Sequence, residues 1–186
     1  KGVEAIVVMP SDGDLARILA EEKIEYIIDP FSFWVNTLDR TGNIVERLKK
    51  RYKFLKFGIK ITQNNRIVVE KLFHRFENQN IDLIYSNSSV INIGFNLAKR
   101  LCVPHIWHIR EFGDKDYNLI PYFGRWNVLR TIRKSDYVIF ISKVLREYYG
   151  FRKFKKCSVV YNGVLSKKRS MLLDTKYPTG DETVFS

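Results

Sequence analysis

The sequence predicts an α/β protein with a doubly wound, mostly parallel sheet and helices on both faces. Short apolar runs that end in small or polar residues carry this prediction, at 82–88, 104–111, 137–142 and 159–163. A continuous apolar run of about four to eight residues is typical of a strand buried in a parallel sheet. Segments with helical spacing separate these runs, and alternating strands and helices are typical of doubly wound folds.

Two further strands are predicted near the start of the chain. Residues Val3–Met9 and Ile24–Ile28 are mostly apolar, and the helix between them is expected to begin at Asp12 or Asp14. Aspartate accepts hydrogen bonds from the free N–H groups of a helix start, so either residue suits that position.

A long, basic helix is predicted from Thr41 to about Asn80, with a break near Gly58 or at 63–65. Its apolar stripe is Val45, Leu48, Tyr52, Leu55 and Ile59, and its basic residues include Arg47, Lys49, Lys50, Arg51, Lys53 and Lys56. A basic amphipathic helix can lie on an anionic membrane, where each Lys or Arg contributes about 1 kcal/mol. The alternative is that the stripe packs on the sheet while the basic residues face water.

In the second half, helices are expected after each apolar run. The stripe from Val90 to Leu101 contains Gly94, which indicates close packing against the sheet because Gly costs a helix about 1 kcal/mol relative to Ala. Another helix is expected near 122–133. Ser142 can cap a helix that Gly150 ends, and a strand over 157–161 follows.

Polar side chains follow the predicted strands where each strand ends. They are Ser86, Asn87 and Ser88; His108, Arg110 and Glu111; Ser142; and Asn162 and Gly163. The carboxyl ends of parallel strands line the crevice in which open α/β folds bind ligands, so we expect these residues on one rim. Free backbone N–H groups after Ser86 favour an anion or hydroxyl site there, and an ordinary helix cap is the alternative. A tight turn explains Asn162–Gly163 equally well.

Composition narrows the possible partners. The net charge is +12, which favours an anionic partner: nucleic acid, a membrane surface or a phosphorylated substrate. Cys102 and Cys157 lack metal-ligand spacing and are expected to be buried free thiols, and no metal site is expected. No stretch approaches the about 20 apolar residues of a membrane span.

Four of these pieces, in this order, resemble the amino-terminal domain of family 4 (group 1) glycosyltransferases, which have the GT-B fold. They are 82–89, 104–111, 135–142 and 159–164, and residues 7–15 are similar to the second strand and turn of such enzymes. The resemblance implies a Rossmann-like acceptor-binding domain over 1–165. Residues 166–186 would be a linker and the start of a carboxyl-terminal donor-binding domain, and the family's first strand would precede Lys1. Alone, this half is not expected to transfer sugar.

The resemblance also suggests catalytic residues. The family's prominent histidine falls six residues after the proline, which here is Arg110, with Glu111 in the acidic position beside it. Arg110 would bind phosphate, and Glu111 or His108 could serve as the base that deprotonates an acceptor hydroxyl. The alternative is that Arg110 and Glu111 form a simple ion pair and that His108 is a core residue.

Partners and location follow from the same resemblance. It implies a nucleotide-sugar donor, a glycan or lipid-linked glycan acceptor, and a role in bacterial polysaccharide or glycolipid synthesis. No cofactor is expected and transfer would be metal-independent. The enzyme would be cytoplasmic and peripheral on the inner face of the plasma membrane, bound through the basic helix. Phe31, Phe33 and Trp34 form an apolar loop that covers the core or touches lipid or acceptor.

Two other classes fit parts of the sequence. A basic α/β module that binds nucleic acid without catalysis would explain the charge, but the chain carries no recognised nucleic-acid signature. A flavodoxin-like or response-regulator-like domain is disfavoured, because the first predicted strand ends in neither a phosphate-cradling turn nor an acidic cluster.

Overall fold

The computed structural model describes residues 2–163. In chain order the elements are β1 (Ile6–Met9), α1 (Asp14–Glu21), β2 (Glu25–Ile28), β3 (Val35–Asn36), α2 (Ile44–Phe76), β4 (Ile84–Ser86), α3 (Ile93–Leu101), β5 (His105–Ile109), α4 (Asp114–Tyr117), β6 (Ile120–Pro121), α5 (Arg125–Ile132), β7 (Tyr137–Phe140), α6 (Lys143–Tyr148) and β8 (Cys157–Val159). The predicted linker and the start of a second domain, 166–186, lie outside the described residues.

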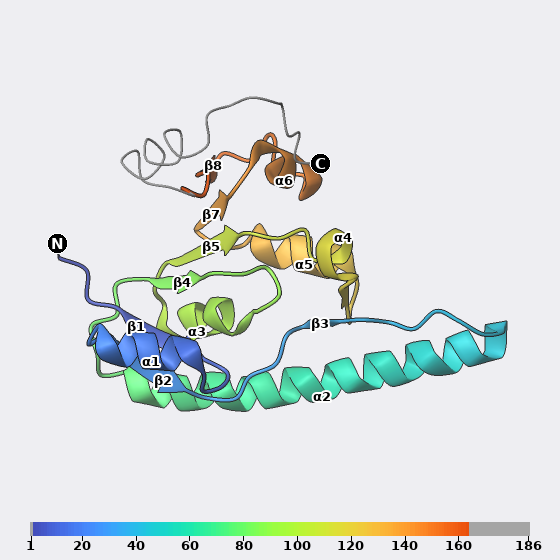
Figure 1. The fold of residues 1–186 in the computed structure, drawn as a ribbon, viewed down its shortest axis with the longest axis horizontal. Helices are drawn as coiled ribbons and strands as arrows, with labels where there is room; N and C mark the ends of the chain where they lie inside the picture. The colour runs from blue at the N-terminus through green and yellow to red at the C-terminus, as the bar shows by residue number, and fades with distance from the viewer. Residues whose placement is uncertain (1, 164–186) are drawn as a thin grey trace, which may run out of the picture.

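Strands β1 and β2 form a parallel pair with helices on both faces (Figure 1). Val7 and Met9 pack against α1, whereas Ile6 and Val8 pack in a cluster with residues of α2 and α3. This alternation follows from the two-residue period of a strand. Helix α1 begins at Asp14, one of the two predicted starts, but its N-cap is Gly13 and no side chain caps it.

The other long sheet has four parallel strands in the order β4-β5-β7-β8. Its core face carries the fully buried Trp107, Ile109, Val138 and Phe140, which pack with residues of α3, α5 and α6. On the opposite face, Tyr85 is 48% exposed. The predicted parallel α/β alternation is confirmed, but it is built from two parallel sheets rather than one, joined by the α2–α3 layer.

A short antiparallel pair, β3 with β6, was not predicted. Val35 lies opposite Pro121 and Asn36 opposite Ile120. Each strand has only two residues, too few for a periodic signal. The pair ties the segment before α2 to the segment before α5.

Helix α2 is a single, unbroken helix of 33 residues, so the predicted break near Gly58 or 63–65 is wrong. A Cβ at Gly58 would lie 2.5 Å from the Cβ of Tyr122, so the glycine permits close packing rather than a kink. Asn65 is buried and uses its amide to bond the backbone N–H and C=O of Ser32 at 3.0 and 2.8 Å. A capping box of Asn43 and Glu46 starts the helix.

Because a helix rises about 1.5 Å per residue, α2 is about 50 Å long, and one end of it extends beyond the two sheets. Figure 1 shows its amino-terminal part extending away from both sheets. Its buried residues are Phe54, Gly58, Ile61, Asn65, Val68, Val69, Leu72 and Phe76. The helix is therefore anchored from its middle to its carboxyl end, and its first turns carry no buried residue.

Candidate functional site

The carboxyl ends of the four-stranded sheet lie side by side. Ser86 pairs with Trp107, Ile109 with Phe140, and Phe140 with Val159. The segments that leave these strands therefore meet at one edge, as the sequence predicted. The side chains that follow do not all reach that edge.

Glu111 is the best-anchored polar side chain at this edge. Its Oε1 accepts hydrogen bonds from the Ser88 hydroxyl at 2.7 Å, the Ser89 backbone N–H at 2.6 Å and the Ser89 hydroxyl at 2.8 Å. Within the described residues its Oε2 has no hydrogen-bond partner. The carboxylate is thus fixed by one oxygen and offers the other.

Two tryptophans hold the same serine loop from the core side. The indole N–H of Trp107 donates to the carbonyl of Ser88 at 2.7 Å, and that of Trp34 donates to the carbonyl of Ser89 at 2.8 Å. The two rings stack at 5.8 Å. Trp34 therefore covers the core, which was one of the two alternatives predicted for this apolar loop. Phe31 packs against the core cluster around α2 and α3, and Phe31 and Phe33 line a groove of about 310 Å³ beside α2.

Tyr149 completes the anchoring of this loop, although it was not among the residues predicted from the sequence. Its hydroxyl donates to Ser89 Oγ at 3.0 Å and to the Glu111 carbonyl at 3.3 Å. Burial raises the pKa of Tyr149 to about 12, so the hydroxyl stays a donor at neutral pH. The one sequence feature that could have pointed to Tyr149 is its position just before Gly150, at the end of a predicted helix.

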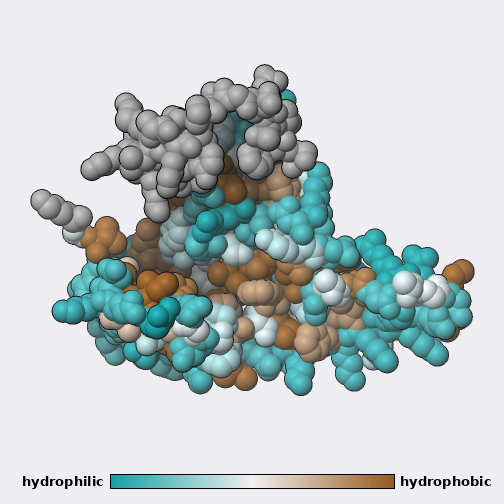
Figure 2. Space-filling view, in the orientation of Figure 1, coloured by the Kyte–Doolittle hydropathy of each residue, from teal (hydrophilic) through white to brown (hydrophobic). Residues whose placement is uncertain are grey.

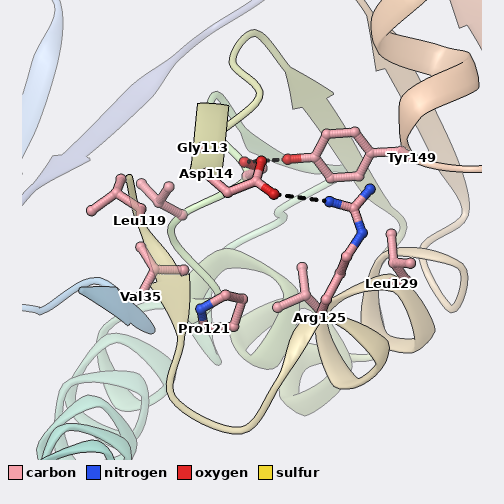
Figure 3. A pocket seen from close by; sticks show the side chains of 11 residues that line it. Val35, Gly113, Asp114, Leu119, Pro121, Arg125, Leu129 and Tyr149 are labelled. Carbon is pink, nitrogen blue, oxygen red and sulfur yellow. Dashed lines mark hydrogen bonds and ion pairs between the residues drawn. The ribbon is translucent and has the colours of Figure 1, made fainter. Parts of the chain in front are cut away.

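A cavity of about 60 Å³ lies beside this cluster (Figure 3). Across it, the Arg125 guanidinium faces the Asp114 carboxylate at 3.4 Å and stacks 4.0 Å from the centre of the Tyr148 ring. The Tyr148 hydroxyl also donates to Asp114. The space suits a few water molecules. It is too small for a sugar in this conformation.

Arg110 and Glu111 point to different surroundings. Arg110 is exposed, and among the described residues it forms no ion pair with Glu111, whose Oε1 is taken by the serines. The predicted alternative of a simple Arg110–Glu111 ion pair is therefore not observed.

His108 lies on the sheet face opposite the core cluster and bonds the Tyr85 hydroxyl through Nδ1 at 2.5 Å. Burial, and then the nearby Arg110 charge, lower the pKa of His108, while the Glu111 charge opposes them. The imidazole is neutral at pH 7. Its Nε2 is buried and has no partner within the described residues.

Ser86 lies in the core rather than on the rim. It is 2% exposed, and its hydroxyl pairs with Nε2 of the equally buried His105 at 2.9 Å. A Cβ at Gly94 would lie 2.3 Å from Ser86 Oγ, which confirms the close helix packing predicted there. The side chain points inward because it shares a strand face with Ile84, which packs toward the helices.

The remaining predicted residues are spread along the edge. Ser142 accepts a hydrogen bond from the Leu145 backbone N–H at 3.1 Å, as the predicted cap of α6. Asn87 is exposed after β4, and Asn162 and Gly163 are exposed after β8. The rim therefore brings together Ser88 and Glu111, with Ser89 and Tyr149 added.

Comparison with known proteins agrees with this architecture. The model of Glycosyltransferase Family 4 matches residues 1–165. The chain belongs to this family. No curated protein and no solved structure gives a significant match. A family 4 glycosyltransferase takes its sugar from a nucleotide-sugar donor and transfers it to an acceptor, so the predicted class of enzyme is confirmed.

The six basic residues of this glycosyltransferase chain that were predicted to bind a membrane lie in the projecting first half of α2. Lys50 pairs with Asp39 at 2.6 Å, and this bond holds the pKa of Asp39 below its usual range. The apolar stripe that was expected to pack on the sheet, or else to face a membrane, is exposed: Leu48 is 66% and Tyr52 67% exposed. In Figure 2 the projecting end is mostly hydrophilic, with hydrophobic residues at its tip. Sheet packing of the stripe is therefore wrong.

Three further predictions concern a metal site, a membrane span and the two cysteines, and the structure describes residues 2–163 for each. In that range no group of three or more His, Cys, Asp or Glu side chains is arranged to hold a metal ion, and no helix is long and apolar enough to cross a membrane. Of the two cysteines, Cys102 is exposed, which corrects the prediction of buried thiols. It ends α3 with a φ of 58°, a position at the surface.

Proposed function

We propose that this chain is the acceptor-side domain of its glycosyltransferase and that Glu111 acts on the acceptor hydroxyl. The acceptor is a glycan or lipid-linked glycan, in bacterial polysaccharide or glycolipid synthesis. The observation that carries the proposal is the fixed Glu111 carboxylate, anchored through Oε1 with Oε2 unpartnered among the described residues. A base in a transfer reaction needs such a lone pair within hydrogen-bond reach of the hydroxyl.

In this proposal Glu111 and Arg110 have separate tasks. Glu111 Oε2 accepts a hydrogen bond from the acceptor hydroxyl and takes its proton as the oxygen attacks the anomeric carbon of the donor sugar. The bond between that carbon and the donor phosphate breaks, and the nucleotide leaves with the electron pair. Arg110, exposed at the same strand end, binds phosphate oxygens of the donor through its forked N–H groups. His108 is a weaker candidate for the base, because Tyr85 occupies its Nδ1 and its Nε2 is buried.

The donor is a substrate, and we propose no resident cofactor and no bound metal ion. The other proposed partner is the anionic inner face of the plasma membrane, which gives a cytoplasmic, peripheral location. The basic first half of α2 supports this partner, since Arg47, Lys49, Lys53 and Lys56 are exposed on it.

The experiment measures sugar transfer by the full-length protein. A panel of radiolabelled nucleotide sugars is incubated with lipid and polysaccharide extracts, with and without a chelator. Glu111→Gln and Arg110→Ala are each expected to lower the transfer rate at least about tenfold, in the range of a lost general base or phosphate contact. Asn64→Ala, an exposed change on α2 away from this rim, is the control and should keep the rate.

Wild-type rates in Glu111→Gln would overturn the assignment of the base. Loss of transfer with the chelator would overturn metal independence while leaving the acceptor-side role in place.

A further inference from the structure

The projecting end of α2 exposes the apolar stripe of Val45, Leu48, Tyr52, Leu55 and Ile59, of which only Leu55 is half-buried, and Ile44 extends it by one residue. Ile44, Val45, Leu48, Tyr52 and Ile59 are 76%, 59%, 66%, 67% and 52% exposed. At about 3.6 residues per turn they lie within about a third of the helix circumference, and the buried face of Phe54, Gly58 and Ile61 lies away from them. A stripe of this size on a well-capped helix indicates an interaction surface.

The flanks of the stripe are basic. Lys49 and Lys56 border it on one side, and Arg47 and Arg51 border it on the other. Glu46 is the only acidic residue of α2 before Glu70. Within the described residues none of these four flanking side chains forms an ion pair; Lys50, which does pair with Asp39, lies off the stripe.

The spacing of the stripe by itself fits either a second copy of this helix or an anionic membrane surface. Val45, Leu48, Tyr52, Leu55 and Ile59 alternate three and four residues apart, which is also the pattern of a coiled-coil seam. In a helix pair, the positions that flank the seam of one copy face those of the other. Here they hold Lys49, Arg51 and Lys56, so a second copy would bring like charges together. The charge therefore disfavours self-pairing and favours an anionic surface.

We propose that this stripe inserts into the interface of an anionic phospholipid bilayer, with Lys49 and Lys56 on one flank and Arg47 and Arg51 on the other contacting lipid phosphates. The inference rests on the membrane partner of the proposed function and names the face that binds it. The apolar side chains enter the boundary of the acyl chains, while the long basic side chains extend back to the headgroups. The amino-terminal part of the helix extends beyond both sheets (Figure 1).

The test is co-sedimentation of the chain with vesicles, in which wild type is compared with variants of the same net charge. Wild type should bind vesicles of phosphatidylcholine with phosphatidylglycerol and should bind pure phosphatidylcholine weakly. Leu48→Ser with Tyr52→Ser keeps the charge and should weaken the partition at least about tenfold, since two apolar side chains no longer insert. Ile67→Ser is the matched control: Ile67 is exposed on the same helix, 61%, but outside the stripe.

Charge variants test the flanks. Lys49→Gln with Lys56→Gln should weaken binding to anionic vesicles and reduce its salt dependence. Lys153→Gln with Lys155→Gln makes the same change of net charge on an exposed segment between α6 and β8 and should have little effect. Because all these side chains are exposed, circular dichroism should show the same fold in every variant.

Three outcomes would overturn the proposal. The first is vesicle binding that Leu48→Ser with Tyr52→Ser leaves unchanged or that Ile67→Ser weakens equally. The second is a dimer in sedimentation equilibrium that the stripe variant dissolves, which assigns the stripe to a second copy. The third is salt-sensitive binding to oligonucleotides without binding to anionic vesicles. Transfer to a water-soluble acceptor by the full-length protein is measured separately, so loss of lipid binding and failure of the proposed function give different results.

Discussion

His105 illustrates how a single buried side chain links the fold to pH. The imidazole is 2% exposed between Phe95 and Trp107 and bonds the Ser86 hydroxyl. Its Nδ1 has no partner among the described side chains. Burial lowers the pKa of His105 from 6.5 to about 4, with the nearby Asp136 charge opposing the change. The folded state therefore binds this proton more weakly than the unfolded chain.

The consequence is a loss of stability in acid. Above pH 6.5 His105 is neutral in both states, and as the pH falls toward 4 the unfolded chain takes up the proton first. Between pH 7 and pH 5 the free energy of unfolding should fall by about 2 kcal/mol because of this residue, at 1.36 kcal/mol per unit of pKa. Urea denaturation of wild type and His105→Gln at both pH values measures the slope, which should flatten in the variant. His74→Gln, an exposed change, should keep it; a wild-type slope in His105→Gln would contradict the prediction.

At the scale of residues, the sequence predicted the edge of the sheet where the site lies better than it predicted which side chains reach that edge. Position after a strand correctly placed Glu111 and Ser88 together at one edge of the sheet, because parallel strand ends share an edge. It misplaced Ser86, since the last residue of a strand faces inward or outward according to a register that the apolar run does not reveal. It also missed Tyr149, which reaches the serine loop from 60 positions away. Trp34 was expected to cover the core or touch a ligand, but its hydrogen bond to Ser89, 55 positions away, was not foreseen.

At the scale of elements, α2 shows how tertiary contacts override local propensity. Gly58 and Asn65 are poor helix formers, and the sequence therefore predicted a break. In the structure both face the core, Gly58 against Tyr122 and Asn65 against Ser32. The side chains that destabilise the isolated helix are those that fit it to its neighbours. The exposed stripe was recognised, but only the structure decided which face is buried.

Gly58→Ala is expected to destabilise the protein although it improves helix propensity. Alanine gains about 1 kcal/mol over glycine in a helix interior, but the new Cβ would lie 2.5 Å from the Cβ of Tyr122. Overpacking of this kind costs about 1–3 kcal/mol, so the net change should be a loss. Asn64→Ala, exposed on the same helix, is the control and should be neutral or stabilising. Urea denaturation measures both, and a more stable Gly58→Ala would show that the β6–α5 segment yields without cost.

At the scale of the whole molecule, the two parallel sheets have unequal cores. The four-stranded sheet buries Trp107, Ile109, Val138 and Phe140 completely against three helices. The β1–β2 pair has only two strands, and its α1 side is a small cluster around Met9. The alternation of strands and helices predicted the strands of both sheets but placed them in one sheet, because their separation depends on strand pairing that apolar runs do not encode.

This asymmetry predicts that the molecule opens in parts. A two-stranded sheet is only marginally stable by itself, so β1, α1 and β2 should unfold locally at a lower free energy than the four-stranded sheet. Native-state hydrogen exchange followed by mass spectrometry compares peptides over 6–28 with peptides over 105–109 and 137–140. Peptides over 6–28 should exchange through local opening, which costs less free energy than global unfolding. Peptides over 105–109 and 137–140 should exchange only through global unfolding. Equal protection in both groups would mean that the α2–α3 layer couples the two sheets into one cooperative unit, because Ile6, Val8 and Ile84 all pack on it.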